Sequence, residues 1–190
     1  MQAFRLIVLI VLVSLTAVAQ TPPASTPPVD DAFVQSEFGS TCKLVPGPAP
    51  TIADLNGDGI DDIVIVARCT NPMLDQAEHA YKVVDPYNSF FGYGNPKVTS
   101  AFASEDPGRR GLALLIIHGA GAEAWRSATT KAKFLIINLP FQQIMVKKLA
   151  VRKKMVTAIY AEESGGEKAI SAMFWDGKKY KYQPLGSTME

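Results

Sequence analysis

The chain has 190 residues, of which 47% are hydrophobic and 19% are charged, and its 19 basic and 18 acidic residues give a net charge of +1. This composition excludes a disordered acidic chain, a collagen-like fibre and a strongly basic nucleic-acid-binding protein. The length predicts one globular domain, because a single domain usually spans about 100 to 200 residues.

The N-terminus has the pattern of a secretory signal peptide. Arg5 precedes the apolar run 6–13, and an Ala-Val-Ala sequence ends at Ala19. We therefore expect residues 1–19 to be cleaved and the mature chain to be exported, either to the periplasm or as a secreted protein. A retained anchor is the alternative, although the apolar segment is shorter than the about 20 residues that a membrane span needs. No later stretch is long enough to span a bilayer.

Charge is distributed unevenly over the mature chain. Residues 20–105 contain 11 acidic and 4 basic residues, a net charge of −7, whereas residues 106–190 contain 7 acidic and 14 basic residues, a net charge of +7. The basic half carries short runs at 147–148, 152–154 and 178–181. These runs predict a solvated sheet face and hairpin tip, with polyanion binding as the alternative, whereas nucleic acid is not the expected partner.

The domain organisation follows from composition. Residues 20–32 are rich in Pro and small polar residues, which predicts an extended linker after the signal peptide. The folded domain is expected at 33–190. One helix is predicted at 72–84, where apolar residues recur at helical spacing before Pro86.

Most of the other periodic segments predict β-strands. They are strand-length, rich in β-branched or aromatic residues, and bounded by Gly, Pro or charge. These segments are 60–69, 112–118, 132–139, 144–151, 155–161, 170–175 and 178–183. Asp176-Gly177 separates the last two and predicts a two-residue hairpin turn. The fold class expected is mainly β, with α+β as the alternative: an antiparallel sheet domain with one short helix.

Two cysteines, Cys42 and Cys69, are present. Export to an oxidising compartment would allow a disulfide between them. Two buried free thiols are the alternative, because the sequence does not show whether the side chains approach each other.

The segment ADLNGDGIDDIV, residues 53–64, predicts a cation site. Its acidic and amide side chains occur at alternate positions, and glycines between them let the backbone curl so that these side chains face one centre. All are hard oxygen donors, which favours Ca²⁺ over Zn²⁺. The predicted ligands are the side chains of Asp54, Asn56 and Asp58, the backbone carbonyl of Ile60, and the closing carboxylate of Asp62, with Asp61 as the alternative for the last.

An EF-hand loop begins in the same way but has a Glu at its twelfth position. Counting from Asp54, that position is Ile65, within a predicted strand, so the EF-hand interpretation fails. Residues 53–66 instead resemble the calcium loop of FG-GAP and VCBS-type repeats, the blade motif of integrin-α-like propellers. The resemblance implies a Ca²⁺ loop joined to a β-strand; with a single copy of the motif, a closed propeller is not expected. The alternative is a metal-free turn, in which the carboxylates accept hydrogen bonds from backbone amides.

No convincing catalytic set is present. Residues 112–121 end in His-Gly-Ala-Gly after a predicted strand, which resembles the oxyanion-hole segment of lipases and esterases. No Gly-x-Ser-x-Gly nucleophile motif accompanies it. We therefore expect an exported, non-catalytic module with one structural Ca²⁺ loop, acting as a binding or cell-envelope-associated protein with a protein or glycan partner. The alternative is a secreted hydrolase with a site near His118 under the aromatic loop 87–102.

Overall fold

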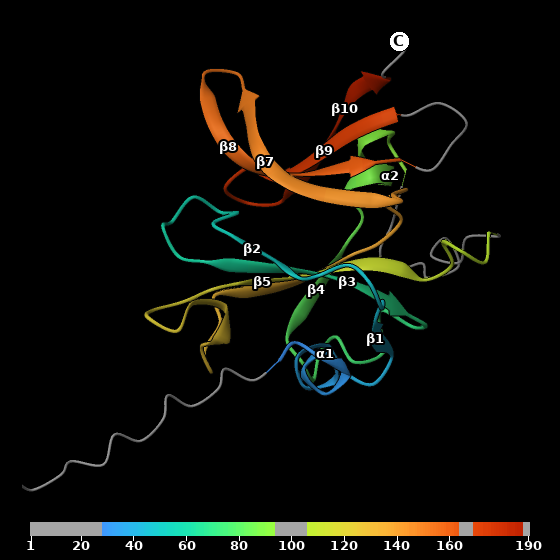
Figure 1. The fold of residues 1–190 in the computed structure, drawn as a ribbon, viewed down its shortest axis with the longest axis vertical. Coiled ribbons are helices and arrows are strands. Elements are labelled where there is room, and N and C mark those ends of the chain that lie inside the picture. The colour runs from blue at the N-terminus through green and yellow to red at the C-terminus, as the bar shows by residue number, and fades with distance from the viewer. Residues whose placement is uncertain (1–27, 94–105, 164–168, 188–190) are drawn as a thin grey trace, which may run out of the picture.

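The structure is a computed structural model that describes residues 28–93, 106–163 and 169–187. Two β-sheets are stacked, and helix α1 (Asp31–Phe38) lies against the outer face of the larger sheet (Figure 1). The signal peptide and most of the linker predicted from the sequence lie outside the described residues. The mainly β fold class is confirmed. In the described ranges, neither sheet closes into a barrel or a propeller.

The larger sheet has six strands, in the order β1-β3-β5-β6-β4, with β2 paired to β3. All its pairs are antiparallel except β4 with β6. Its strands are β1 (Cys42–Leu44), β2 (Thr51–Ala53), β3 (Asp62–Cys69), β4 (Tyr81–Val84), β5 (Leu112–His118) and β6 (Ala132–Ile136).

The smaller sheet is an antiparallel meander of four strands, in the order β10-β9-β8-β7. Its strands are β7 (Gln143–Val151), β8 (Lys154–Glu162), β9 (Ala169–Trp175) and β10 (Tyr180–Ser187). The last hairpin is confirmed, but its loop has four residues rather than the predicted two. The Asp176 carboxylate accepts hydrogen bonds from the amides of Lys178 and Lys179, which stabilises the longer loop.

The prediction of a helix at 72–84 is wrong. Residues 72–80 form turns, and β4 occupies the end of the segment. Tyr81 and Val83 point into the core as alternate residues of a strand, and the Tyr81 hydroxyl donates to the carbonyl of Pro72. Pairing with β6 therefore outweighs the helical spacing of the local sequence.

The described helices are α1, α2 (Pro86–Phe90) and a 3-10 turn, η2 (Ala124–Arg126). Helix α1 was not predicted, and it begins within the segment assigned to the linker. Asp30 caps it by accepting a hydrogen bond from the amide of Phe33. Its buried residues, Val34 and Phe38, then cover one face of the larger sheet.

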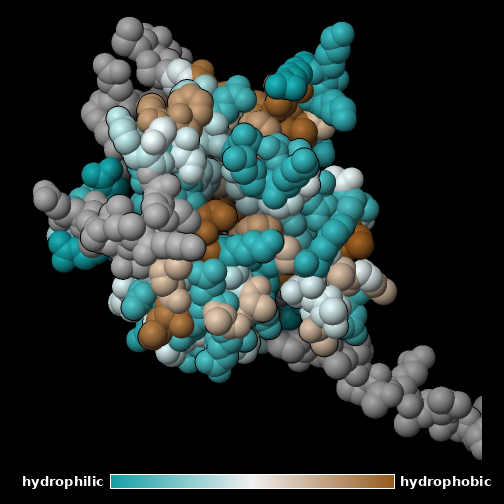
Figure 2. Space-filling view, turned by 180° about the vertical axis from the view of Figure 1, so that it is seen from behind, coloured by the Kyte–Doolittle hydropathy of each residue, from teal (hydrophilic) through white to brown (hydrophobic). Residues whose placement is uncertain are grey.

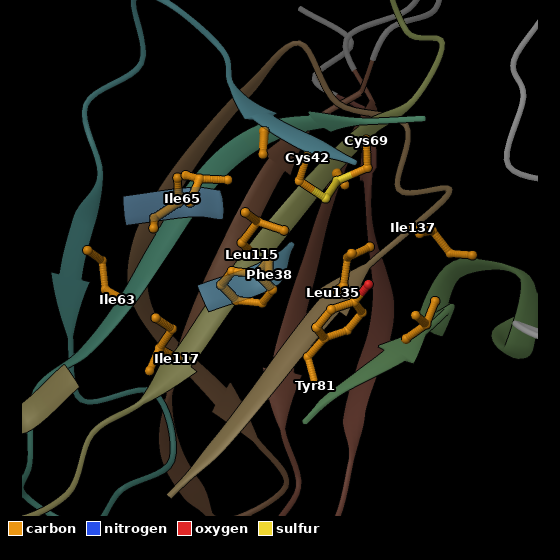
Figure 3. Close-up of a cluster of buried hydrophobic side chains, with 14 of the residues drawn as sticks. Phe38, Cys42, Ile63, Ile65, Cys69, Tyr81, Leu115, Ile117, Leu135 and Ile137 are labelled. Atoms are coloured by element: carbon orange, nitrogen blue, oxygen red, sulfur yellow. A yellow bond between two sulfur atoms is a disulfide. The ribbon is translucent and has the colours of Figure 1, made fainter. Parts of the chain in front are cut away.

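Both faces of the larger sheet are buried, which explains the unbroken apolar run 63–67 within β3. Ile63 and Ile65 face α1 in a core that also contains Leu115 and Leu135 (Figure 3). Val64 and Val66 face the smaller sheet. The acidic loop therefore leads into the most buried strand of the described fold.

The predicted disulfide is confirmed. Cys42 and Cys69 lie directly opposite each other in the register of β1 and β3, and their sulfur atoms are 2.06 Å apart (Figure 3). The bond joins residues 27 apart in sequence, and the segment between them contains the acidic loop. Closing a loop of this length stabilises a fold by about 3 to 4 kcal/mol on the chain-entropy model.

Candidate metal centre

The acidic loop connects β2 to β3 as a hairpin whose last strand pair is Ala53 with Asp62. The backbone curls tightly because Gly57 and Gly59 have φ angles of 80° and 82°, which other residues rarely adopt. A side chain at either glycine would meet no neighbouring atom, so the backbone angle is the reason for glycine here.

Side-chain oxygens in the loop face its own backbone. The Asp54 carboxylate accepts from the amides of Gly57, Asp58 and Gly59 at 2.7, 3.2 and 3.0 Å. The Asn56 carbonyl oxygen accepts from the amide of Asp58 at 2.9 Å. These hydrogen bonds turn the oxygens of alternate residues towards the backbone of one short loop.

Asp62 lies beneath the curl and is completely buried. One oxygen accepts from the amides of Leu55 and Asn56 at 2.8 and 3.3 Å, and the other accepts from the amide of Gly119 at 2.8 Å. Burial raises the pKa of the Asp62 carboxyl to about 6, although these amides favour its charged form. Asp62 therefore connects the acidic loop to the end of β5.

Gly119 was missed as a site residue by the sequence reasoning, which treated it as part of a glycine turn. A Cβ atom here would lie against the carbonyl oxygen of Asp61, 2.6 Å from the carbonyl carbon of Ala124 and 2.7 Å from the amide nitrogen of Trp125. All three contacts are to backbone atoms. The signal available in the sequence was a glycine directly after a buried strand.

Lys131 is the second residue that the sequence reasoning missed. Its ammonium group lies 2.6 Å from an Asp58 carboxylate oxygen, while the other oxygen accepts from the amide of Ile60. The hydrogen bond from Lys131 holds the pKa of Asp58 below its usual range, and the same contact raises the pKa of Lys131. The charges of Asp54 and Asp62 favour the charged lysine further. Lys131 thus supplies a positive charge to the loop.

The residues fit a calcium ion by chemistry. Side-chain oxygens from Asp54, Asn56 and Asp58 share one curl, and a hydrogen-bonded carboxylate oxygen keeps a second lone pair for a cation. The Asp62 carboxylate already accepts hydrogen bonds from three amides. A calcium ion bound to Asp62 would therefore share its oxygens with these amides or replace them. In the described part of the chain, no three Asp, Glu, His or Cys side chains gather closely enough to define a metal site on their own. The ligand set remains a prediction.

His118, the residue of the alternative hydrolase site, is buried between the two sheets. Its Nε2 atom is 2.7 Å from the Tyr180 hydroxyl, and its ring packs against Phe134 and Trp175. Burial lowers the pKa of His118 to about 4, so the ring is neutral at pH 7. These contacts are those of a histidine that packs the core.

The aromatic loop predicted at 87–102 lies partly outside the described residues. Its first residues form α2, which packs on β10 through ring contacts of Tyr87, Phe90 and Phe91 with Tyr182. Phe90 and Phe91 are 51% and 48% exposed. In the described part, the rings of Phe90 and Phe91 therefore pack on the sheet and remain half exposed.

The fold and site define a class: a two-sheet, disulfide-linked β domain with an acidic Asx/Gly loop. No family model matches the chain, and no curated protein or solved structure shows significant similarity to it. The described helices include none that is long and apolar enough to cross a membrane.

Proposed function

We propose that the protein is an exported, non-catalytic β domain that binds Ca²⁺ in the loop 54–62 and serves as a binding or cell-envelope module. One observation carries the calcium proposal: side-chain oxygens of Asp54, Asn56 and Asp58 all accept hydrogen bonds from backbone amides of the same short hairpin loop. The signal-peptide pattern and the Cys42–Cys69 disulfide support export, because disulfides persist in oxidising compartments.

Calcium binding would stabilise the β2–β3 hairpin. Asp54, Asn56 and Asp58 would provide side-chain oxygens, Ile60 its carbonyl, and Asp62 the carboxylate that connects the loop to Gly119. A bound divalent cation would neutralise carboxylates that repel one another at neutral pH, and would compete with Lys131 for Asp58. The expected result is a more rigid β2–β3 hairpin.

Thermal unfolding with Ca²⁺ and with EGTA tests this proposal. We expect Ca²⁺ at 100 times its dissociation constant to stabilise the fold by about 2.7 kcal/mol and so to raise the melting temperature. Asp58→Ala should lose most of that increment. Equal melting temperatures of the wild type in Ca²⁺ and in EGTA would show that the loop is a metal-free turn.

Lys131→Met is the matched variant. It removes the ammonium group from Asp58 but leaves every predicted ligand in place. Its melting temperature in EGTA should fall, because the loop carboxylates lose their cation, and its increment with Ca²⁺ should exceed that of the wild type. An increment unchanged from the wild type would contradict competition between Lys131 and the metal.

A further inference from the structure

Two hairpin turns lie together at one end of the smaller sheet. The β7–β8 hairpin turns between Val151 and Lys154, and the β9–β10 hairpin turns between Trp175 and Tyr180. The register of β8 with β9, in which Ala158 pairs with Phe174, places both turns at the same end. The sheet topology therefore gathers the basic runs that are separated in the sequence.

A groove of about 980 Å³ lies at this end of the sheet. We call it the basic groove. Four cations and four aromatic rings line it: Arg152, Lys153, Lys154, Lys181, Phe90, Phe174, Trp175 and Tyr182. A second hollow, of about 390 Å³, shares Phe90, Lys181 and Tyr182 with it and adds Lys179. Two adjoining hollows form an extended site that suits a chain-like ligand better than a compact one.

The charge of the basic groove is strongly positive. Lys181 pairs with Asp176 at 3.8 Å, but Arg152, Lys153 and Lys154 form no ion pair within the described ranges. All three are exposed. Figure 2 shows hydrophilic side chains bordering hydrophobic ones at this end of the molecule. Uncompensated cations beside apolar surface favour an anionic ligand that also has an apolar face.

The aromatic side chains narrow the class of ligand. Phe90 is 51% exposed, whereas Tyr182, against which it packs with a centroid distance of 5.4 Å, is 6% exposed, and Phe174 is 9% exposed. Trp175 is partly buried, and its ring packs against Tyr180. A single-stranded nucleic acid needs successive exposed rings on which its bases stack. One half-exposed ring beside several cations instead suits a sugar chain, whose apolar C–H face packs on one ring while its acidic groups pair with lysines.

We propose that the basic groove binds an anionic polysaccharide, with its carboxylate or sulfate groups paired to Arg152, Lys153, Lys154 and Lys181 and one sugar face on Phe90. This site is separate from the acidic loop and does not require calcium. Binding measured in EGTA therefore tests it independently of the proposed function.

The test measures binding of the mature, disulfide-bonded chain to polygalacturonate and to heparin by titration calorimetry in EGTA over a series of salt concentrations. The wild type should bind one or both polymers, and the polymer that binds more tightly identifies the preferred acidic group. Lys153→Gln/Lys154→Gln should weaken binding about three- to tenfold and flatten its salt dependence, because two exposed ion pairs are lost. Phe90→Ala should weaken binding without changing the salt dependence.

Lys43→Gln/Lys82→Gln is the matched control. Both lysines are exposed on strands of the larger sheet, and the variant changes the net charge by the same amount. An equal loss in this control would show a non-specific charge effect and would overturn the proposal. Failure of the wild type to bind either polymer, or tighter binding to oligothymidylate than to both, would also overturn it.

Discussion

Gly119 is the residue at which the acidic loop and the sheet depend on each other most directly. Its amide donates to buried Asp62, and the backbones of Asp61, Ala124 and Trp125 surround its α-carbon. Only glycine allows an approach this close, because even a methyl group would overlap with backbone atoms. A carboxylate predicted as a metal ligand therefore also connects the loop to the larger sheet.

We predict that Gly119→Ala destabilises the fold by about 1 to 3 kcal/mol, through overpacking and displacement of the amide from Asp62. Chemical denaturation in EGTA measures the loss. Gly121→Ala is the control, since its Cβ would meet no neighbour and the cost is limited to a left-handed backbone at φ 63°, about 1 kcal/mol. A smaller loss at position 119 than at 121 would contradict the close packing of Gly119.

At the scale of elements, β3 organises the larger sheet. It pairs with β1, β2 and β5, its two faces contribute to both cores, and the disulfide fixes its end to β1. The bond and the acidic loop restrain opposite ends of the same strand. Strand β1 has three residues, so its backbone pairing alone offers little stability.

We predict that Cys42→Ala/Cys69→Ala lowers the free energy of unfolding by about 3 to 4 kcal/mol, because the unfolded chain regains the entropy of the open loop. For a domain of this size, that loss corresponds to a fall of about 6 to 16 °C in melting temperature. Calorimetry of the wild type with and without reductant should show a similar fall. A thiol assay on the denatured, unreduced wild type should find no free cysteine; two free thiols per chain would contradict the disulfide.

At the scale of the whole molecule, the contact between the two sheets contains a buried histidine. His118, at the end of β5, reaches across to Tyr180 on β10 and Trp175 on β9. The charges of Asp58 and Asp54 favour its protonation and that of Lys131 opposes it, but burial dominates and lowers the pKa of His118 to about 4. Packing of the sheets therefore depends on a neutral ring.

The pH dependence of stability follows from this pKa. An unfolded histidine binds a proton below about 6.5, whereas folded His118 does so near 4, so its contribution is complete above pH 6.5 and is lost as pH falls towards 4. Asp62 acts in the opposite direction. Its folded pKa of about 6 exceeds the usual value of 3.8, so the fold gains stability as pH falls from 6 to 3.8.

We therefore predict that the metal-free wild type changes little in stability between pH 6 and pH 4.5, because the two groups offset each other. His118→Gln removes the contribution of the histidine and leaves that of Asp62. The free energy of unfolding of this variant should therefore rise as pH falls from 6 to 4.5, by up to about 1.4 kcal/mol per pH unit. Urea unfolding in EGTA at pH 7, 6, 5 and 4.5 measures both profiles. Parallel profiles would contradict the lowered pKa of His118.

The strands could be predicted largely from local sequence. Segments such as 112–118 and 144–151 are bounded by turn residues and have the periodicity that burial of one or both faces requires, so their type and length depend on neighbouring residues. The prediction of a helix at 72–84 was wrong because the structure of this segment depends on a distant partner. Its end pairs with β6, about 50 residues later in the chain, and no local pattern contains that partner.

The sequence by itself determined the mainly β class, the oxygen-rich loop and the two cysteines able to pair, because these depend on residue type and short-range spacing. The tertiary structure alone decided that Lys131 lies on Asp58, that Gly119 binds Asp62, and that two distant basic turns share one groove. Each of these contacts joins residues from different strands or turns. Such contacts are set by how the two sheets pair and pack, which no single segment specifies.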